Sequence, residues 1–144
     1  MKTSANALTV VAVMSIAASL LGILYGMSLS VIAQMPRSEI LDALSRQQMA
    51  TPEVVDGVFA LARLGNFYAL FNLLELGGLA LLLAHRRPGF HFYAAAQAGT
   101  AGLFVIAFGL SASLAFVLWN LLWVYVYLRL VKSAFADAPG GDDA

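Results

Sequence analysis

The sequence predicts an all-α fold, an integral membrane four-helix bundle with an amphipathic segment in one external loop. Of its 144 residues, 61% are hydrophobic and 11% are charged, whereas soluble domains are about half apolar and a quarter charged. Between residues 64 and 128 the only formal charges are Glu75, Arg86 and Arg87. A domain this small buries too little of its surface to hide so many apolar side chains from water. The lipid bilayer is therefore the expected partner of that surface.

Composition also excludes several classes of function. The net charge is zero, which leaves no basic surface for a nucleic acid. The chain has no cysteine, so disulfides, thiolate metal sites and cysteine nucleophiles are excluded. The sequence contains no recognisable Ser/His/Asp constellation, phosphate-binding loop or carboxylate pair. We therefore expect neither an enzyme nor a bound cofactor.

The first predicted span covers residues 7–33, since a spanning helix needs about 20 apolar residues. Lys2 precedes this run, and Ser15-Ile16-Ala17 is similar to a signal-peptide cleavage site. The apolar run continues far beyond that site, which favours an uncleaved anchor. Pro36 is expected to end the helix.

A charged external segment follows the first span. Ser38 can cap a short helix that runs to Met49. One face of that helix would be apolar, formed by Ile40, Leu41 and Leu44. Such an amphipathic helix would lie on the membrane surface. A solvated loop with one helical turn is the alternative.

Thr51 and Pro52 mark the start of the second long helix. A hydroxyl cap followed by proline at the first helical position is a typical helix N-terminus. We expect this helix to begin outside the bilayer and to run unbroken to Ala84. Its membrane-embedded part would be residues 64–84.

The second half of the chain is predicted to form two further spans. Residues 85–89 form a basic turn that contains proline and glycine. The third span is then expected over residues 90–110 and the fourth over residues 114–131, with Ser111, Ala112 and Ser113 as a minimal turn. Residues 1–135 would make up one four-span domain, and the acidic, glycine-rich residues 136–144 are expected to be disordered.

Lysine and arginine bias predicts the orientation. A four-span arrangement places five basic residues on one side, namely Lys2, Arg86, Arg87, Arg129 and Lys132. The other side has three arginines, which are offset by four acidic residues. Both termini and the turn at residues 85–89 are therefore predicted to be cytoplasmic.

Small residues recur along one face of the first span, at Ser15, Ser19, Gly22, Gly26 and Ser30. Close approach at small residues drives helix association in lipid. This stripe favours a seam within one bundle. Homo-oligomerisation, or contact with a membrane-protein partner, through Gly22 and Gly26 is the alternative.

Glu75 is the main candidate for a chemical role, because its carboxyl group lies deep in a predicted span. It precedes Arg86 by eleven residues, which is about 16 Å of helical rise. That depth is near the middle of a hydrocarbon core about 30 Å thick. An ionisable residue there is a functional hypothesis by default. No basic residue shares the depth, so we expect the neutral acid.

The same count places polar residues of every span at this depth. They are Ser15, Ser19, Asn72, Gln97, Thr100 and Asn120. The sequence therefore predicts a polar layer organised around Glu75. Interhelical hydrogen bonds of roughly 0.6–2 kcal/mol each would make it a structural layer. The alternative is a proton-exchanging or cation-binding site. An open polar cavity that reaches Glu75 would favour the second interpretation.

Other side chains are assigned simpler roles. His85, Arg86 and Arg87 are expected to contact anionic lipid headgroups. His85 and His91 have no further histidine or cysteine beside them, so no metal or haem site is expected. Trp119 lies too deep for an interfacial belt and is interpreted as a packing residue, with a ligand cage as the alternative.

Two resemblances rest on short motifs. Residues 64–132 resemble a loose set of uncharacterised bacterial four-span membrane proteins, through a basic turn followed by Gly89-Phe90, Tyr93 and Gln97. This implies the fold and a bacterial cytoplasmic (inner) membrane. Residues 75–78, Glu-Leu-Gly-Gly, are similar to the second helix of DoxX-like proteins. The first-helix pattern of that family is absent, so no redox role is carried over.

These observations lead to two functional hypotheses. The first is a small non-catalytic integral membrane protein, an accessory or interaction subunit. The alternative is a proton-linked small-solute transporter centred on Glu75.

Overall fold

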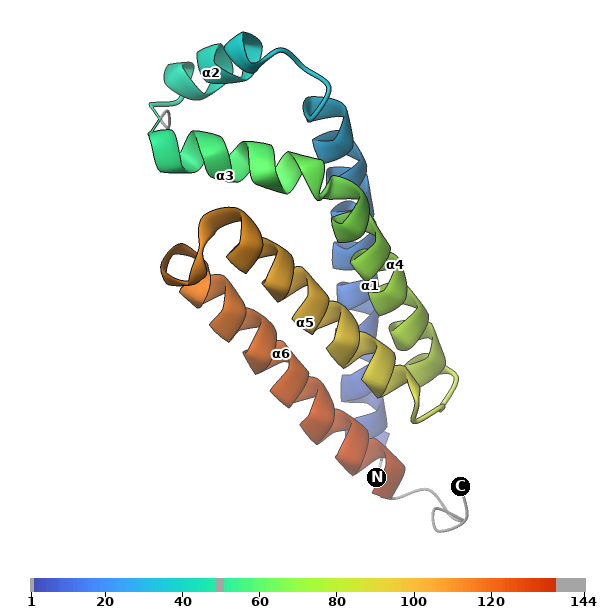
Figure 1. The fold of residues 1–144 in the computed structure, drawn as a ribbon. Helices are drawn as coiled ribbons and strands as arrows, with labels where there is room; N and C mark the ends of the chain where they lie inside the picture. Colours follow the sequence, from blue (N-terminus) through green and yellow to red (C-terminus); the bar gives the residue numbers. More distant parts are fainter. Residues whose placement is uncertain (1, 49–50, 137–144) are drawn as a thin grey trace.

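The computed structural model describes residues 2–48 and 51–136, and within these it contains six α-helices and no strand. They are α1 (Lys2–Ile32), α2 (Arg37–Arg46), α3 (Pro52–Arg63), α4 (Gly65–Leu83), α5 (Gly89–Phe108) and α6 (Leu110–Ala136) (Figure 1). Four of them, α1, α4, α5 and α6, are long and apolar enough to cross a membrane. The predicted all-α class is thus confirmed for these residues. Residues 137–144 of the predicted tail lie outside the described part, and Ala136 ends α6.

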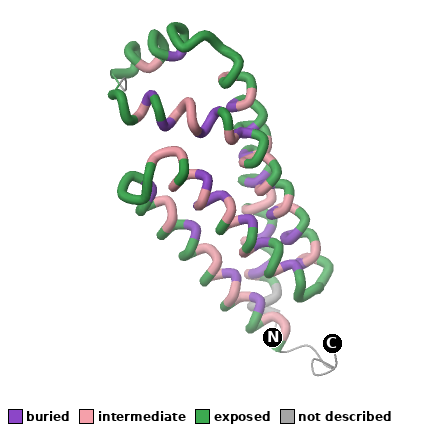
Figure 2. The backbone as a smooth tube through the Cα atoms, viewed as in Figure 1, coloured by how far each residue is buried: buried purple, intermediate pink, exposed green. Residues whose placement is uncertain are grey.

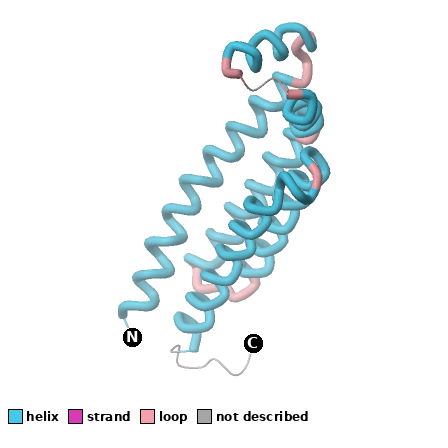
Figure 3. Tube along the Cα trace, turned by 90° about the vertical axis from the view of Figure 1, so that its left-hand side faces the viewer, coloured by secondary structure: helices cyan, strands magenta, loops and turns pink. Residues whose placement is uncertain are grey.

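The four long helices pack in chain order, α1 on α4, α4 on α5 and α5 on α6. The start of α1, the α4–α5 turn and the end of α6 lie at one end of the bundle (Figure 1). Helices α2 and α3 lie at the other end, and α1 forms one edge of the bundle (Figure 3). This arrangement brings together the chain segments that the charge bias assigns to one side.

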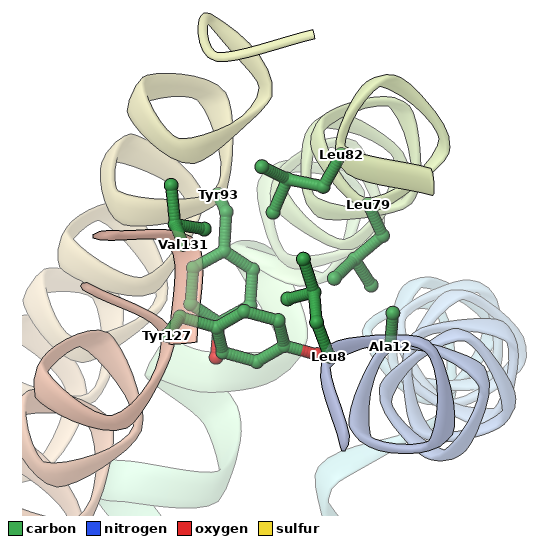
Figure 4. Close-up of a cluster of buried hydrophobic side chains, with 7 residues drawn as sticks. All are labelled: Leu8, Ala12, Leu79, Leu82, Tyr93, Tyr127 and Val131. Atoms are coloured by element: carbon green, nitrogen blue, oxygen red, sulfur yellow. The ribbon is translucent and has the colours of Figure 1, made fainter. Parts of the chain in front are cut away.

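A buried apolar cluster closes the bundle at the end where the chain begins. It consists of Leu8, Ala12, Leu79, Leu82, Tyr93, Tyr127 and Val131 (Figure 4). The rings of Tyr93 and Tyr127 lie 4.2 Å apart between centroids. All four long helices contribute to the cluster, and within it α1 packs against α6.

Glycines let α1 and α4 approach to backbone contact. A Cβ atom at Gly26 would lie 2.8 Å from the carbonyl oxygen of Gly65 and 2.8 Å from the backbone nitrogen of Ala69. Gly22 likewise lies against the side chain of Asn72. The small-residue stripe is thus a seam within one chain, as expected. In this packing α4 covers Gly22 and Gly26, and oligomerisation through them stays a prediction.

The predicted unbroken helix from residue 51 to residue 84 is wrong, because the chain turns at Leu64. The Thr51 cap is present, since its hydroxyl accepts a hydrogen bond from the Val54 N–H at 3.4 Å. Helix α3 then crosses the end of the bundle and leads into α4 at an angle (Figure 1). Gly57 packs directly against the Phe108 ring of α5. The turn lets α3 cover α5 while α4 follows α1, which one straight helix could not do.

The predicted turn at Ser111, Ala112 and Ser113 is also wrong. These residues belong to the first turn of α6, and the chain reverses at Gly109, where φ is +79°. L-residues rarely adopt this backbone conformation, which glycine adopts readily. The Ser113 hydroxyl donates a hydrogen bond to the Phe104 carbonyl at 2.8 Å and so ties α6 back to α5.

The external segment contains the expected short helix, with a different start. Helix α2 begins at Arg37 after Pro36, so Ser38 lies inside its first turn and makes no cap. Ile40 is buried, whereas Leu41 is exposed. The predicted end at Met49 lies outside the described residues, and α2 ends at Arg46. An ion pair of 2.9 Å from Arg37 to Asp56 joins α2 to α3.

Candidate functional site

One cavity in the bundle is lined by all seven polar residues that helical rise places at a common depth. Its volume is about 350 Å³. The seven are Ser15 and Ser19 of α1, Asn72 and Glu75 of α4, Gln97 and Thr100 of α5, and Asn120 of α6. The structure therefore brings together residues from four helices that are up to about a hundred positions apart in the chain. We call this space the Glu75 cavity.

Glu75 joins three helices. The residue is 9% exposed, and its carboxyl group makes side-chain hydrogen bonds with Ser19 of α1 and Gln97 of α5. The Ser19 hydroxyl also lies 2.8 Å from the Ser15 carbonyl, one turn earlier on α1. The carboxyl group is therefore held between helices and faces the interior of the bundle.

Asn72 occupies the space that Gly22 leaves open. Its amide nitrogen donates to the Tyr68 carbonyl at 2.8 Å. A Cβ atom at Gly22 would overlap the Asn72 amide group. The glycine of α1 therefore allows this amide to be buried beside Glu75. The sequence indicated a close seam at Gly22 but not its function in seating Asn72.

The remaining polar residues are also held in place. Asn120 is 5% exposed, and its amide nitrogen donates to the Phe116 carbonyl at 2.7 Å. Thr100 is buried as well. Within the described part of the chain, every buried side-chain nitrogen or oxygen has a hydrogen-bond partner. The polar groups are therefore oriented by the protein itself, which is the usual state of buried polar atoms.

Aromatic rings make up much of the cavity wall. They belong to Tyr68, Tyr93, Phe116, Trp119 and Trp123. The two tryptophan rings lie 5.7 Å apart in an edge-to-face arrangement. Trp119 is 56% exposed, so its interpretation as a packing residue is wrong. The signal that could have found this wall is the placement of the two tryptophans on either side of Asn120, within one turn of the helix.

The cavity is flanked by a hydrogen bond towards one end of the bundle and by an aromatic stack towards the other, and exposed residues border it at one side. Towards the start of α1, the Tyr127 hydroxyl and the Ser15 hydroxyl make a 2.8 Å hydrogen bond above the apolar cluster. Towards α3, the rings of Phe104 and Phe116 stack at 4.0 Å. Between these ends, three exposed residues border the cavity, Met14 and Ala18 of α1 and Trp119 of α6. We call this gap between α1 and α6 the mouth.

The described lining of the cavity combines hydrogen-bonding groups, one acid and aromatic rings. Among the described residues that line the cavity, Glu75 has the one carboxyl group, and none is a lysine, arginine or histidine. In the described ranges no group of three or more His, Cys, Asp or Glu side chains could hold a metal ion. What the site offers a ligand is hydrogen bonds, a single acid and aromatic faces.

The basic turn lies at the end of the bundle, away from the cavity. His85 has a φ of +55°, and the following Arg86 N–H bonds back to the Leu81 carbonyl at 2.8 Å, which closes the C-terminus of α4. The Arg87 guanidinium lies 5.7 Å from the centroid of the Phe135 ring. His85, Arg86 and Arg87 are all exposed, and their contact with lipid headgroups stays a prediction.

Comparison of the chain with known protein families, curated proteins and solved structures found no match. The resemblances to bacterial four-span proteins and to DoxX-like proteins therefore stay predictions from short motifs.

Proposed function

We propose that this chain is a non-catalytic, multi-pass membrane protein that binds a small hydrogen-bonding solute in the Glu75 cavity. The observation that carries the proposal is that polar side chains from four helices line one cavity. A layer that served only to fix helix register would be expected to close on itself. The cavity volume of about 350 Å³ instead falls within the range of roughly 300–1,000 Å³ typical of small-molecule sites.

The outer surface of the bundle supports the membrane assignment. Large apolar side chains are exposed along all four long helices, among them those of Leu21, Leu70, Ile106 and Leu118. Figure 2 shows exposed positions along each of these helices. A continuous apolar surface of this kind is unfavourable in water. We place the chain in a bacterial cytoplasmic membrane, with both termini and the turn at residues 85–89 on the cytoplasmic side, from its charge bias and its resemblances.

Proton-linked transport of the solute is the second candidate. It is favoured by the position of Glu75, a carboxyl group that contacts two other helices inside the cavity. Acidic residues inside membrane proteins commonly exchange protons along transport pathways. A change in the protonation of Glu75 would alter its bonds to Ser19 and Gln97, and with them the contact of α4 with α1 and α5. The accessory-subunit hypothesis has no comparable observation in its favour.

The test is to block the mouth without disturbing the bundle. Ala18 is exposed and borders the cavity, so Ala18→Phe places a ring in the mouth. Ala17 is exposed on the same helix and does not line the cavity, which makes Ala17→Phe the matched control. The proteins are purified in a mild non-ionic detergent, and bound small molecules are identified by native mass spectrometry.

We expect a solute on the wild type and on Ala17→Phe, and its loss from Ala18→Phe. Equal retention by all three proteins would show that the solute binds elsewhere. If no solute were found on the wild type, the proposal that the Glu75 cavity retains its ligand through purification would be contradicted.

A further inference from the structure

We propose that the solute is an amphiphilic organic cation, an amine or quaternary ammonium group with an apolar chain, that reaches the cavity sideways from the bilayer. This inference rests on the proposed function and specifies its ligand. Three independent features carry it. They are the acidic side chain in the cavity without a basic neighbour in its lining, the aromatic residues of the cavity wall and the position of its mouth.

The first feature is the sign of charge. Among the described lining residues, only Glu75 can carry a charge near neutral pH, and its side-chain hydrogen bonds are to the neutral groups Ser19 and Gln97. A buried carboxylate without a cationic partner is unfavourable, and a cation that enters the cavity would provide that partner. An anionic ligand would meet no positive side chain here. The cavity therefore selects against anions and favours cations.

The second feature is the aromatic wall. Five aromatic residues line the cavity, and the two indoles of Trp119 and Trp123 stand edge to face at its mouth side. Aromatic faces attract organic cations through their negative quadrupole, and this attraction is strongest when the cation is desolvated. A small inorganic cation is bound through oxygen ligands and gains little from ring faces. The combination of one acid with several rings therefore indicates an organic cation.

The third feature is the mouth, which determines the shape of the ligand. Met14, at 69% exposure, and Trp119, at 56%, border the opening between α1 and α6. The Tyr127–Ser15 hydrogen bond flanks the cavity towards one end of the bundle, and the Phe104–Phe116 stack flanks it towards the other. The exposed lining residues lie between α1 and α6, so a ligand whose polar head is at Glu75 would extend its apolar chain through that side of the bundle. That side would face the acyl chains of the bilayer, which accommodate such a chain.

Protons should compete with the ligand. The ionised form of Glu75 attracts a cation and the neutral form does not, so the affinity should fall as the pH is lowered. The other titratable groups that face this carboxyl group are Tyr68 of α4, Tyr93 of α5 and Tyr127 of α6. None of these phenols gains a charge in mildly acidic or neutral solution. The pH dependence would therefore report on Glu75.

The experiment uses the two tryptophans of the chain as reporters, because both of them line the cavity. The full-length protein in dodecyl maltoside micelles is titrated with dodecyltrimethylammonium, and tryptophan emission is recorded. The matched probe is dodecyldimethylamine oxide, which has the same chain and a head of similar size without net charge in mildly alkaline solution. Ala18→Phe keeps both tryptophans and so measures the emission change that results from partitioning of the probe into the micelle.

We expect a saturable change with the cation, at least tenfold weaker binding of the amine oxide, and weaker cation binding as the pH is lowered. Glu75→Gln should lose the preference for the cation, Ala18→Phe should lose saturable binding, and Ala17→Phe should retain it. The comparison of the two probes on the wild type needs no variant at Glu75 and remains decisive if Glu75→Gln fails to fold.

Equal affinity for the two probes on the wild type would overturn the cation inference. If Ala18→Phe still abolished that binding, the proposed solute site would stand, with an uncharged ligand. If neither probe produced a saturable change while native mass spectrometry found a solute that Ala18→Phe removed, the ligand class would be wrong and the site correct. Failure of both measurements would refute the site itself.

Discussion

The seam between α1 and α4 makes the sharpest prediction about stability. Gly26→Ala adds one methyl group where the nearest atoms belong to the backbone of α4. That methyl carbon would lie 2.8 Å from the Gly65 oxygen and 2.8 Å from the Ala69 nitrogen. Carbon atoms make favourable contacts only near 3.5–4.0 Å, so the two helices must separate by several tenths of an ångström.

The matched control is Gly77→Ala on α4. A Cβ atom at Gly77 meets nothing within 4 Å, and both glycines lie inside long helices. The change in helix propensity is therefore similar in the two variants and cancels in their difference. Overpacking at a well-packed contact costs about 1–3 kcal/mol. We expect Gly26→Ala to be less stable than Gly77→Ala by about that amount.

The measurement is reversible unfolding of the purified protein in mixed micelles of non-ionic detergent and dodecyl sulfate, followed by circular dichroism. A lower midpoint for Gly26→Ala than for the wild type and for Gly77→Ala would support the seam. Equal midpoints for Gly26→Ala and Gly77→Ala would refute the close approach of α1 and α4. In that case Gly22 and Gly26 would again be available for contact with a second chain.

Two further predictions concern the α5–α6 turn and the hydrogen bond that flanks the cavity. Gly109→Ala places a side chain at a φ of +79° and should lower the free energy of unfolding by about 1–3 kcal/mol. Gly102→Ala is the control, because it lies at an open helical position and should not lower that free energy. Equal effects of the two substitutions would argue against the turn at Gly109. Tyr127→Phe removes the hydrogen bond to Ser15 and should cost about 0.5–1.5 kcal/mol. The same change at the exposed Tyr125 is its control, and an equal loss there would show that this bond contributes nothing.

The sequence by itself determined the helical class and the level of the polar groups. Hydropathy and the constant rise of a helix are local properties, so counting from Arg86 to Glu75 measures a depth that does not depend on how the helices pack. For the same reason Gln97, Thr100 and Asn120 could be assigned to the level of Glu75 before any packing was known. The Thr51 cap was equally local, because it depends only on residues within one turn.

Only the tertiary structure decided how these groups are arranged. The turn at Leu64, the reversal at Gly109 and the exposure of Trp119 depend on contacts between residues that are far apart in the sequence. Whether a polar layer is closed or encloses a cavity depends on how closely each pair of helices can approach. Glycines bring α1 and α4 together, whereas Met14 and Trp119 border an opening between α1 and α6. Periodicity within one helix contains no information on that spacing, because it is set by side chains on the neighbouring helix.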